Sequence, residues 1–197
     1  MYSIVEIFTS LQGEGRFVGH PVNFIRLAGC SMGCKFCDTD IKERETLTAG
    51  QILTRLSPAY SSIVVLTGGE PLEQDCEELV VALHDDGYSV HLETNGKWLI
   101  WLRLGFDWIS MSPKRQWSPS IGNLRKVSEI KWLVPEWPFE KVLWGIQNFP
   151  GAEHYVQPVN DRLKINKKAL RTCLEYIARS GGRLKLSVQL HKLIGVR

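Results

Sequence analysis

The sequence predicts an α/β fold in which about six parallel strands form a partial, TIM-type βα barrel. Short apolar runs rich in β-branched residues alternate with stretches whose apolar residues recur every three or four positions. Strands that alternate with helices form parallel sheets with right-handed crossovers, and they bind ligands at the carboxyl ends of the strands. About six strands are too few to close an eight-stranded barrel of roughly 250 residues, so the 197 residues fit one domain, residues 1–197.

The first half of the chain carries two predicted strands and two predicted helices. The strand over 24–27 is apolar, and Thr48 and Gln51 then have the capping-box spacing that starts a helix. The run over 62–66 ends at a glycine pair and predicts a buried parallel strand. A helix with acidic early turns follows and ends at Gly87. Its apolar face comprises Leu72, Cys76, Leu79, Val80 and Leu83.

The alternation continues to the end of the chain. Strands are expected over 90–93, 108–111 and 130–134, with a helix over 97–104 between the first two. Asn166 is expected to cap a later helix, which the pair Gly181 and Gly182 closes before a last strand over 184–188. The apolar face of that helix comprises Leu170, Cys173, Leu174 and Ile177.

Composition excludes several classes of protein. Hydrophobic residues make up 44% and charged residues 23% of the chain, which is typical of a globular domain and not of a disordered chain. The net charge of +3 is too weak to indicate nucleic-acid binding. No apolar run approaches the roughly 18 residues that a membrane span needs. Glu6 precedes any basic residue, which is unlike a secretion signal, so we expect no nucleic-acid partner and no membrane partner.

Three of the five cysteines, Cys30, Cys34 and Cys37, lie within eight residues, directly after the strand predicted over 24–27. An odd, clustered set of cysteines favours metal or catalytic thiols in a reducing compartment, so we expect a cytoplasmic protein. Three neighbouring thiolates suit an iron–sulfur cluster or zinc. Cys76 and Cys173 supply no convincing fourth ligand, because each lies on the apolar face of a predicted helix. A cluster held by three thiolates leaves one iron open to an exogenous molecule.

The spacing Cys-x3-Cys-x2-Cys, with Phe36 before the last cysteine, resembles the radical S-adenosylmethionine (radical SAM) superfamily. In that superfamily the amino and carboxylate groups of S-adenosylmethionine chelate the open iron of a [4Fe–4S] cluster. The run Thr67-Gly68-Gly69-Glu70-Pro71 resembles the superfamily's glycine-rich motif. A residue without a β-carbon lets the main chain approach a ligand closely. The resemblance implies a radical SAM core.

Further segments, from one end of the chain to the other, resemble one branch, the 7-carboxy-7-deazaguanine synthase family. This resemblance implies a lyase that converts 6-carboxy-5,6,7,8-tetrahydropterin to 7-carboxy-7-deazaguanine through a 5′-deoxyadenosyl radical, with ring contraction and loss of ammonia. The product is a precursor of the queuosine-type bases of tRNA, and magnesium binds the substrate carboxylate. The segments are Phe8-Thr-Ser-Leu-Gln-Gly-Glu-Gly15, Phe24-Ile-Arg-Leu27, Cys37-Asp-Thr39, Glu93-Thr-Asn-Gly96, Ser112-Pro-Lys114 and Gln189-Leu-His-Lys192.

The resemblance also assigns roles to individual residues. Cys30, Cys34 and Cys37 would hold the cluster, and Thr39 would bind magnesium. Family members use a reducing partner, here a flavodoxin-like or ferredoxin-like electron donor, and form homodimers. The residues that would bind the pterin substrate are Leu11, Gln12, Gly13, Arg26 and Thr67. Those that would bind S-adenosylmethionine are Phe36, Asp38, Gly69, Ser112, Pro113 and Lys114.

Two features depart from the family pattern, and two other functions stay open. The sequence ends at Arg197, where family members commonly have a proline whose terminus contributes to the substrate pocket, and the Trp- and Pro-rich segment 132–151 matches nothing diagnostic. A radical SAM enzyme that activates a partner protein's glycine would need a large docking surface and no magnesium. A zinc-stabilised binding module would bind zinc and tolerate loss of Gly68 and Gly69.

Overall fold

The computed structural model describes residues 1–37, 39–99, 105–115, 126–160 and 164–197. Nine strands in this part of the chain form one open sheet. From one edge to the other they are β3 (Glu45–Leu47), β1 (Tyr2–Leu11), β2 (Pro21–Leu27), β4 (Ile63–Gly68), β5 (Ser89–Thr94), β6 (Trp108–Met111), β7 (Glu129–Val134), β8 (Glu153–Pro158) and β9 (Lys185–Leu186). The helices are α1 (Ala49–Leu53), α2 (Glu77–Asp85), α3 (Phe139–Asn148), α4 (Lys167–Arg179) and α5 (Leu190–Ile194), with short 3-10 turns η1 (Gly15–Phe17) and η2 (Pro71–Glu73).

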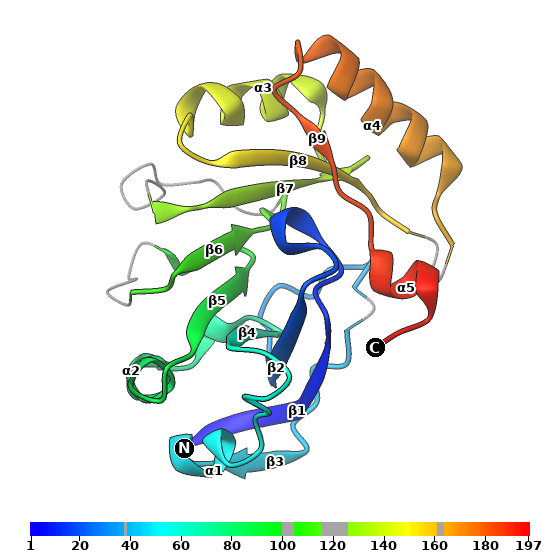
Figure 1. The fold of residues 1–197 in the computed structure, drawn as a ribbon. Helices are drawn as coiled ribbons and strands as arrows, with labels where there is room; N and C mark the ends of the chain where they lie inside the picture. The colour runs from blue at the N-terminus through cyan, green and yellow to red at the C-terminus, as the bar shows by residue number, and fades with distance from the viewer. Residues whose placement is uncertain (38, 100–104, 116–125, 161–163) are drawn as a thin grey trace.

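The sheet is curved but does not close, and α2, α3 and α4 lie on its outer side (Figure 1). Strands β2 and β4 to β9 pair in parallel, while β1 is antiparallel to both of its neighbours. The prediction of a partial βα barrel is therefore confirmed, with seven parallel strands among the described residues where about six were expected. The sequence reasoning missed β8, whose six residues include Glu153, His154 and Gln157 and so lack an apolar run. It also missed β1 and β3.

The helices predicted after Thr48, before Gly87 and after Asn166 occur as α1, α2 and α4, with corrections to the last two. Thr48 and Gln51 form the expected capping box of α1, and Asn166 accepts hydrogen bonds from two backbone amides at the start of α4. Helix α2 begins only at Glu77, after the separate turn η2. Leu174 was wrongly placed on the apolar face of α4, because it is exposed, whereas Cys173 is buried. The last strand is shorter than predicted, and most of the helix predicted over 97–104 lies outside the described residues.

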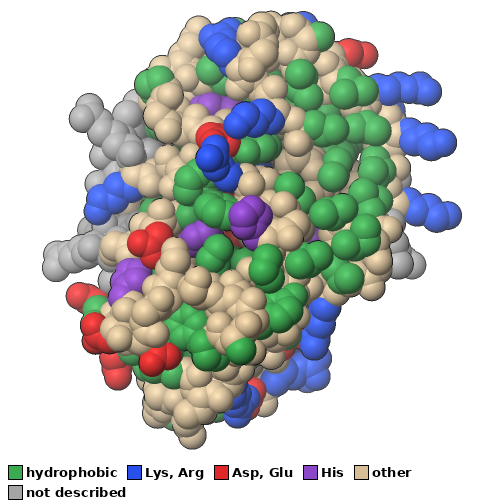
Figure 2. Space-filling view, in the orientation of Figure 1, with side chains coloured by type: hydrophobic (Ala, Val, Ile, Leu, Met, Phe, Trp, Pro, Cys, Tyr) green, Lys and Arg blue, Asp and Glu red, His purple; other side chains and the backbone are tan. Residues whose placement is uncertain are grey.

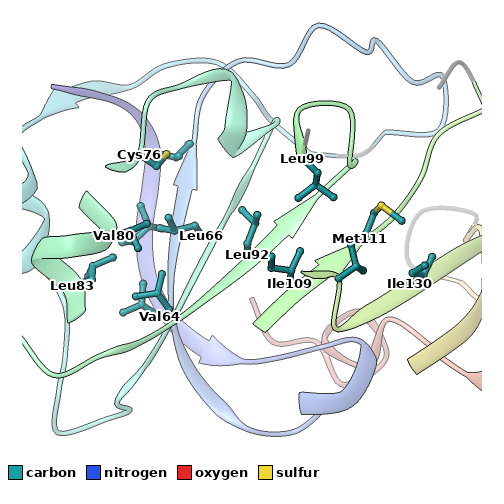
Figure 3. Close-up of a cluster of buried hydrophobic side chains, with 14 of the residues drawn as sticks. Val64, Leu66, Cys76, Val80, Leu83, Leu92, Leu99, Ile109, Met111 and Ile130 are labelled. Carbon is teal, nitrogen blue, oxygen red and sulfur yellow. The ribbon is translucent and has the colours of Figure 1, made fainter. Parts of the chain in front are cut away.

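The two faces of the sheet differ in polarity. On the outer face, Leu66, Leu92 and Ile130 are fully buried and face a core to which α2 contributes Val80 and Leu83 (Figure 3). The next residue of each strand points to the opposite face, as the pleat requires. These residues are polar, namely Thr67, Glu93 and Lys131. The hydrophobic core therefore lies between sheet and helices, and the concave face is left for polar groups.

The Trp- and Pro-rich segment folds as β7 and α3. Gly145 of α3 packs directly on Trp132 of β7, since a β-carbon at Gly145 would lie 2.1 Å from Cζ2 of that indole. Trp132 and Trp137 make an edge-to-face contact with centroids 5.5 Å apart. The indoles of this segment thus serve helix-to-sheet packing. None of the helices in the described ranges has the length and apolar character to cross a bilayer.

Candidate active site

Two cavities, of 720 Å³ and 490 Å³, lie beside the carboxyl ends of the central parallel strands. The smaller one is bordered by the cysteine loop that follows β2, and the larger one by the end of β1 and the segment around α5. Five residues line both cavities, so the two spaces share a boundary. These residues are Glu14, Thr39, Thr67, Glu93 and Gln189.

The smaller cavity contains the three clustered cysteines. Cys30 and Cys34 are partly buried and Cys37 is exposed, and a backbone hydrogen bond of 3.0 Å from Cys37 to Cys34 closes the turn between them. Partial burial raises the pKa of the Cys30 and Cys34 thiols, and the Lys114 ammonium opposes this at Cys34. The Lys114 ammonium also lies 5.9 Å from the centroid of the Phe36 ring and 2.8 Å from Ser112 Oγ. The remaining two thiols, Cys76 and Cys173, are buried in the core as predicted.

The glycine pair joins the end of β4 to the start of the cysteine loop. The Gly69 amide donates to the Leu27 carbonyl at 3.0 Å, and the Glu70 amide donates to the Gly29 carbonyl at 2.9 Å. A β-carbon at Gly69 would lie 1.7 Å from the Gly29 oxygen. The glycine is therefore required by contact between two backbones, and it lines the cavity through that packing.

The buried side chain of Glu70 holds the end of β5 and the loop that follows it. It is fully buried, and its two oxygens accept hydrogen bonds from the Thr94 hydroxyl at 2.6 Å and the Asn95 amide at 2.7 Å. Burial raises the pKa of Glu70, although these hydrogen bonds oppose the rise. Thr94 and Asn95 line the smaller cavity, so this glutamate shapes the cavity without facing it.

The larger cavity contains the segment at the end of β1 together with Arg26 of β2. The amide oxygen of Gln12 accepts hydrogen bonds from the Gly13 amide at 2.8 Å and the Glu14 amide at 3.3 Å, which fixes the turn. Arg26 Nε donates to Glu6 Oε1 at 2.9 Å, a contact that fixes one edge of the guanidinium. Arg197 also pairs with Glu6 and lines this cavity.

The boundary between the cavities is built from charged side chains. Lys131 of β7 lies 2.8 Å from Glu14 Oε2 and 2.6 Å from Glu93 Oε2. Burial opposes ionisation of Glu14, but the Lys131 ammonium outweighs it and lowers the pKa of Glu14 to about 2. Sequence reasoning assigned no role to these residues. The available signal was a lysine inside the otherwise apolar segment Ile130 to Val134.

The structure brings most of the predicted site residues to these two cavities. The proposed pterin contacts all line the larger one, and Thr67 lines both. The three cysteines, Phe36, Gly69, Ser112 and Lys114 line the smaller one. Pro113 is not among the lining residues; it is buried, and its carbonyl accepts a hydrogen bond from Trp137 Nε1 at 2.9 Å. Asp38 lies outside the described residues.

Known proteins match this arrangement in sequence and in structure. The family model of the radical SAM superfamily matches residues 24–152. The 7-carboxy-7-deazaguanine synthase of Bacteroides thetaiotaomicron is 35% identical over 198 residues, which cover all of both chains. The synthase of the same name from Synechocystis is 34% identical over 206 residues, covering all of this chain and 94% of the relative.

The chain belongs to the 7-carboxy-7-deazaguanine synthase family. The crystal structure of QueE from Escherichia coli is also similar, with a TM-score of 0.75 and 28% identity over 96% of this chain and 94% of that one. The names of these relatives support neither of the two alternative functions considered above, an enzyme that activates a glycine of a partner protein and a zinc-stabilised binding module. Membership of the radical SAM superfamily implies a [4Fe–4S] cluster and S-adenosylmethionine as cofactors.

The residues of the smaller cavity fit these two cofactors. Its donor set consists of three soft thiols on one short loop, which suits an iron–sulfur cluster. The three thiols line one cavity but do not converge, since no three His, Cys, Asp or Glu side chains in the described ranges are placed to hold a metal ion. Asn95 Nδ2 is a buried donor at this cavity without a hydrogen-bond partner among the described residues. Such a donor is satisfied when a ligand brings an acceptor.

Proposed function

We propose that this member of the 7-carboxy-7-deazaguanine synthase family converts 6-carboxy-5,6,7,8-tetrahydropterin to 7-carboxy-7-deazaguanine, with ring contraction and loss of ammonia. One observation carries the proposal: the cavity with three thiols and the cavity with Arg26 share a boundary. A substrate in the larger cavity then lies next to a cofactor in the smaller one. When bound, the cluster and S-adenosylmethionine supply one-electron chemistry that removes a hydrogen atom from the substrate.

The protein's own residues bind and orient the pterin. The guanidinium of Arg26 offers a planar set of donors that can take the substrate carboxylate in two hydrogen bonds. Its Nε is already held by Glu6, so the direction of the side chain is set before the substrate arrives. The turn from Leu11 to Gly13, fixed by the Gln12 side chain, borders the ring.

The experiment that tests the function begins with anaerobic reconstitution of the protein with iron and sulfide. The protein is then incubated with S-adenosylmethionine, reductant, magnesium and the carboxytetrahydropterin. We expect 5′-deoxyadenosine and 7-carboxy-7-deazaguanine to form together. Formation of 5′-deoxyadenosine without the deazaguanine would keep the superfamily chemistry and reject this substrate.

We also propose that Thr39 contributes to a magnesium site at the boundary of the two cavities. Thr39 lines both cavities, and a hydroxyl oxygen suits a hard cation that retains several waters. Replacing Thr39 with alanine is expected to raise the magnesium concentration required for half-maximal activity by roughly tenfold, because one oxygen ligand is lost. The measurement is a magnesium titration of turnover, and an unchanged titration would refute the assignment.

An electron donor of the flavodoxin or ferredoxin type and a homodimeric state complete the proposal. Exposed apolar side chains support the homodimer. They gather on the right-hand side of Figure 2, where α4, β9 and α5 lie. An exposed apolar surface of this kind is typical of an interface between proteins. The exposed residues of these elements include Leu174, Leu186, Leu193 and Ile194.

A further inference from the structure

Lys131 is a buried cation in a strand that is buried along its whole length. Its side chain is 3% exposed, and β7 otherwise presents mainly apolar residues. Removing an ammonium and two carboxylates from water costs several kcal/mol per ion, and apolar residues in place of all three would avoid this cost. A lysine at this position therefore calls for an explanation beyond stability of the fold.

The two partners of Lys131 are each held by a second polar side chain. Glu14 presents Oε2 to Lys131 and accepts a hydrogen bond at Oε1 from Gln189 Nε2, at 2.8 Å. Glu93 presents Oε2 to Lys131 and accepts at Oε1 from Gln12 Nε2, at 3.2 Å. The lysine thus joins residues from three separate parts of the chain. Both carboxylates line both cavities.

The electrostatic environment makes the two carboxyl groups unequal. Lys131 lowers the pKa of Glu14 despite burial, whereas burial and the charges of Glu14 and Glu129 raise the pKa of Glu93 against the effect of Lys131. Glu14 is therefore ionised at neutral pH. The other charged or titratable groups that act on this cluster are Glu129 of β7, Lys114 after β6 and His191 of α5.

We propose that Lys131 is a positioning residue: its ammonium holds Glu14 and Glu93 at the boundary of the cavities as acceptors for the N–H groups of the bound pterin. The inference rests on the proposed function, since a reduced pterin carries N–H donors on both of its rings. Lys131 lines only the smaller cavity and acts on a substrate in the larger one through the two carboxylates.

The test replaces Lys131 with methionine, which keeps an unbranched side chain of similar length and removes the charge. Without the ammonium, ionisation of the buried carboxyl groups becomes harder and their pKa values rise. We expect kcat/KM at pH 7 to fall by about 100-fold and the rising limb of its pH profile to move to higher pH by roughly one unit or more. A purely structural role would lower kcat/KM equally at every pH. If the rising limb of the pH profile stays at the wild-type pH, the proposal is overturned.

Lys131→Arg is the companion variant, because it keeps the positive charge. It tests the proposal even if Lys131→Met does not fold. We expect its pH profile to match the wild type, while the KM for the pterin rises about tenfold as the larger guanidinium displaces the carboxylates. An unchanged KM overturns the proposal. Wild-type protein that cleaves S-adenosylmethionine but leaves the pterin intact would instead refute the proposed function.

Discussion

Replacing Cys34 with alanine is expected to abolish turnover and to remove most of the bound iron. Cys34 is one of three thiols at the smaller cavity, and two thiolates do not retain a cubane cluster. Cys34 is partly exposed and contributes nothing to the hydrophobic core, so the variant should fold normally. The measurements are iron content, the cubane absorption and spin signals after reconstitution, and 5′-deoxyadenosine formation.

Cys76→Ala is the matched control for this prediction. Cys76 is 1% exposed in the core beside α2, and burial raises the pKa of its thiol to about 12, so it is a poor source of thiolate. We expect this variant to lose about 1 kcal/mol of stability and to keep its iron and its activity. Retention of a full cluster and full activity in Cys34→Ala would contradict the assignment of the ligands.

Gly69→Ala is expected to lower the free energy of unfolding by about 3 kcal/mol, because the added β-carbon would meet the Gly29 carbonyl oxygen at 1.7 Å. Backbone has to move to relieve that contact, since no flexible side chain is involved. The movement would separate the end of β4 from the cysteine loop and break the hydrogen bond from Glu70 to Gly29. Chemical denaturation measures the stability, and iron content reports the cysteine loop.

Gly151→Ala provides the control for the loss of a glycine as such. A β-carbon at Gly151 would meet nothing within 4 Å, and the residue has an ordinary negative or extended φ. We expect its stability to stay within about 0.5 kcal/mol of wild type. Equal stabilities of the two alanine variants would show that the close contact at Gly69 is not required.

Much of the fold could be predicted because periodicity and capping act locally. The apolar run of β4, the capping box at Thr48 and the Asn166 cap each involve residues close in sequence. Strands β1 and β3 were missed because their pairing depends on distant partners, such as Ser3 with Thr46. Leu174 was misplaced because periodicity gives the spacing of a helix face but not how far the sheet covers it.

The candidate site was predictable to the extent that its residues form short motifs. The cysteine spacing and the glycine pair are recognised from the sequence alone, and both motifs line the smaller cavity. The cluster of Glu14, Glu93 and Lys131 joins residues as much as 117 positions apart, which no local sequence pattern brings together. Pro113 was included as part of a motif; it lines neither cavity, and its carbonyl accepts a hydrogen bond from Trp137.

The common boundary of the two cavities has a consequence for inhibitor design. A pterin-like group and an adenosine-like group, joined by a short tether, could occupy both spaces at once and contact Thr39 and Thr67 on the way. Binding of the first group would raise the effective concentration of the second to the millimolar range or above. We expect such a bisubstrate compound to bind this enzyme more tightly than either of its two groups alone. Radical SAM enzymes with a differently shaped substrate cavity should bind it more weakly.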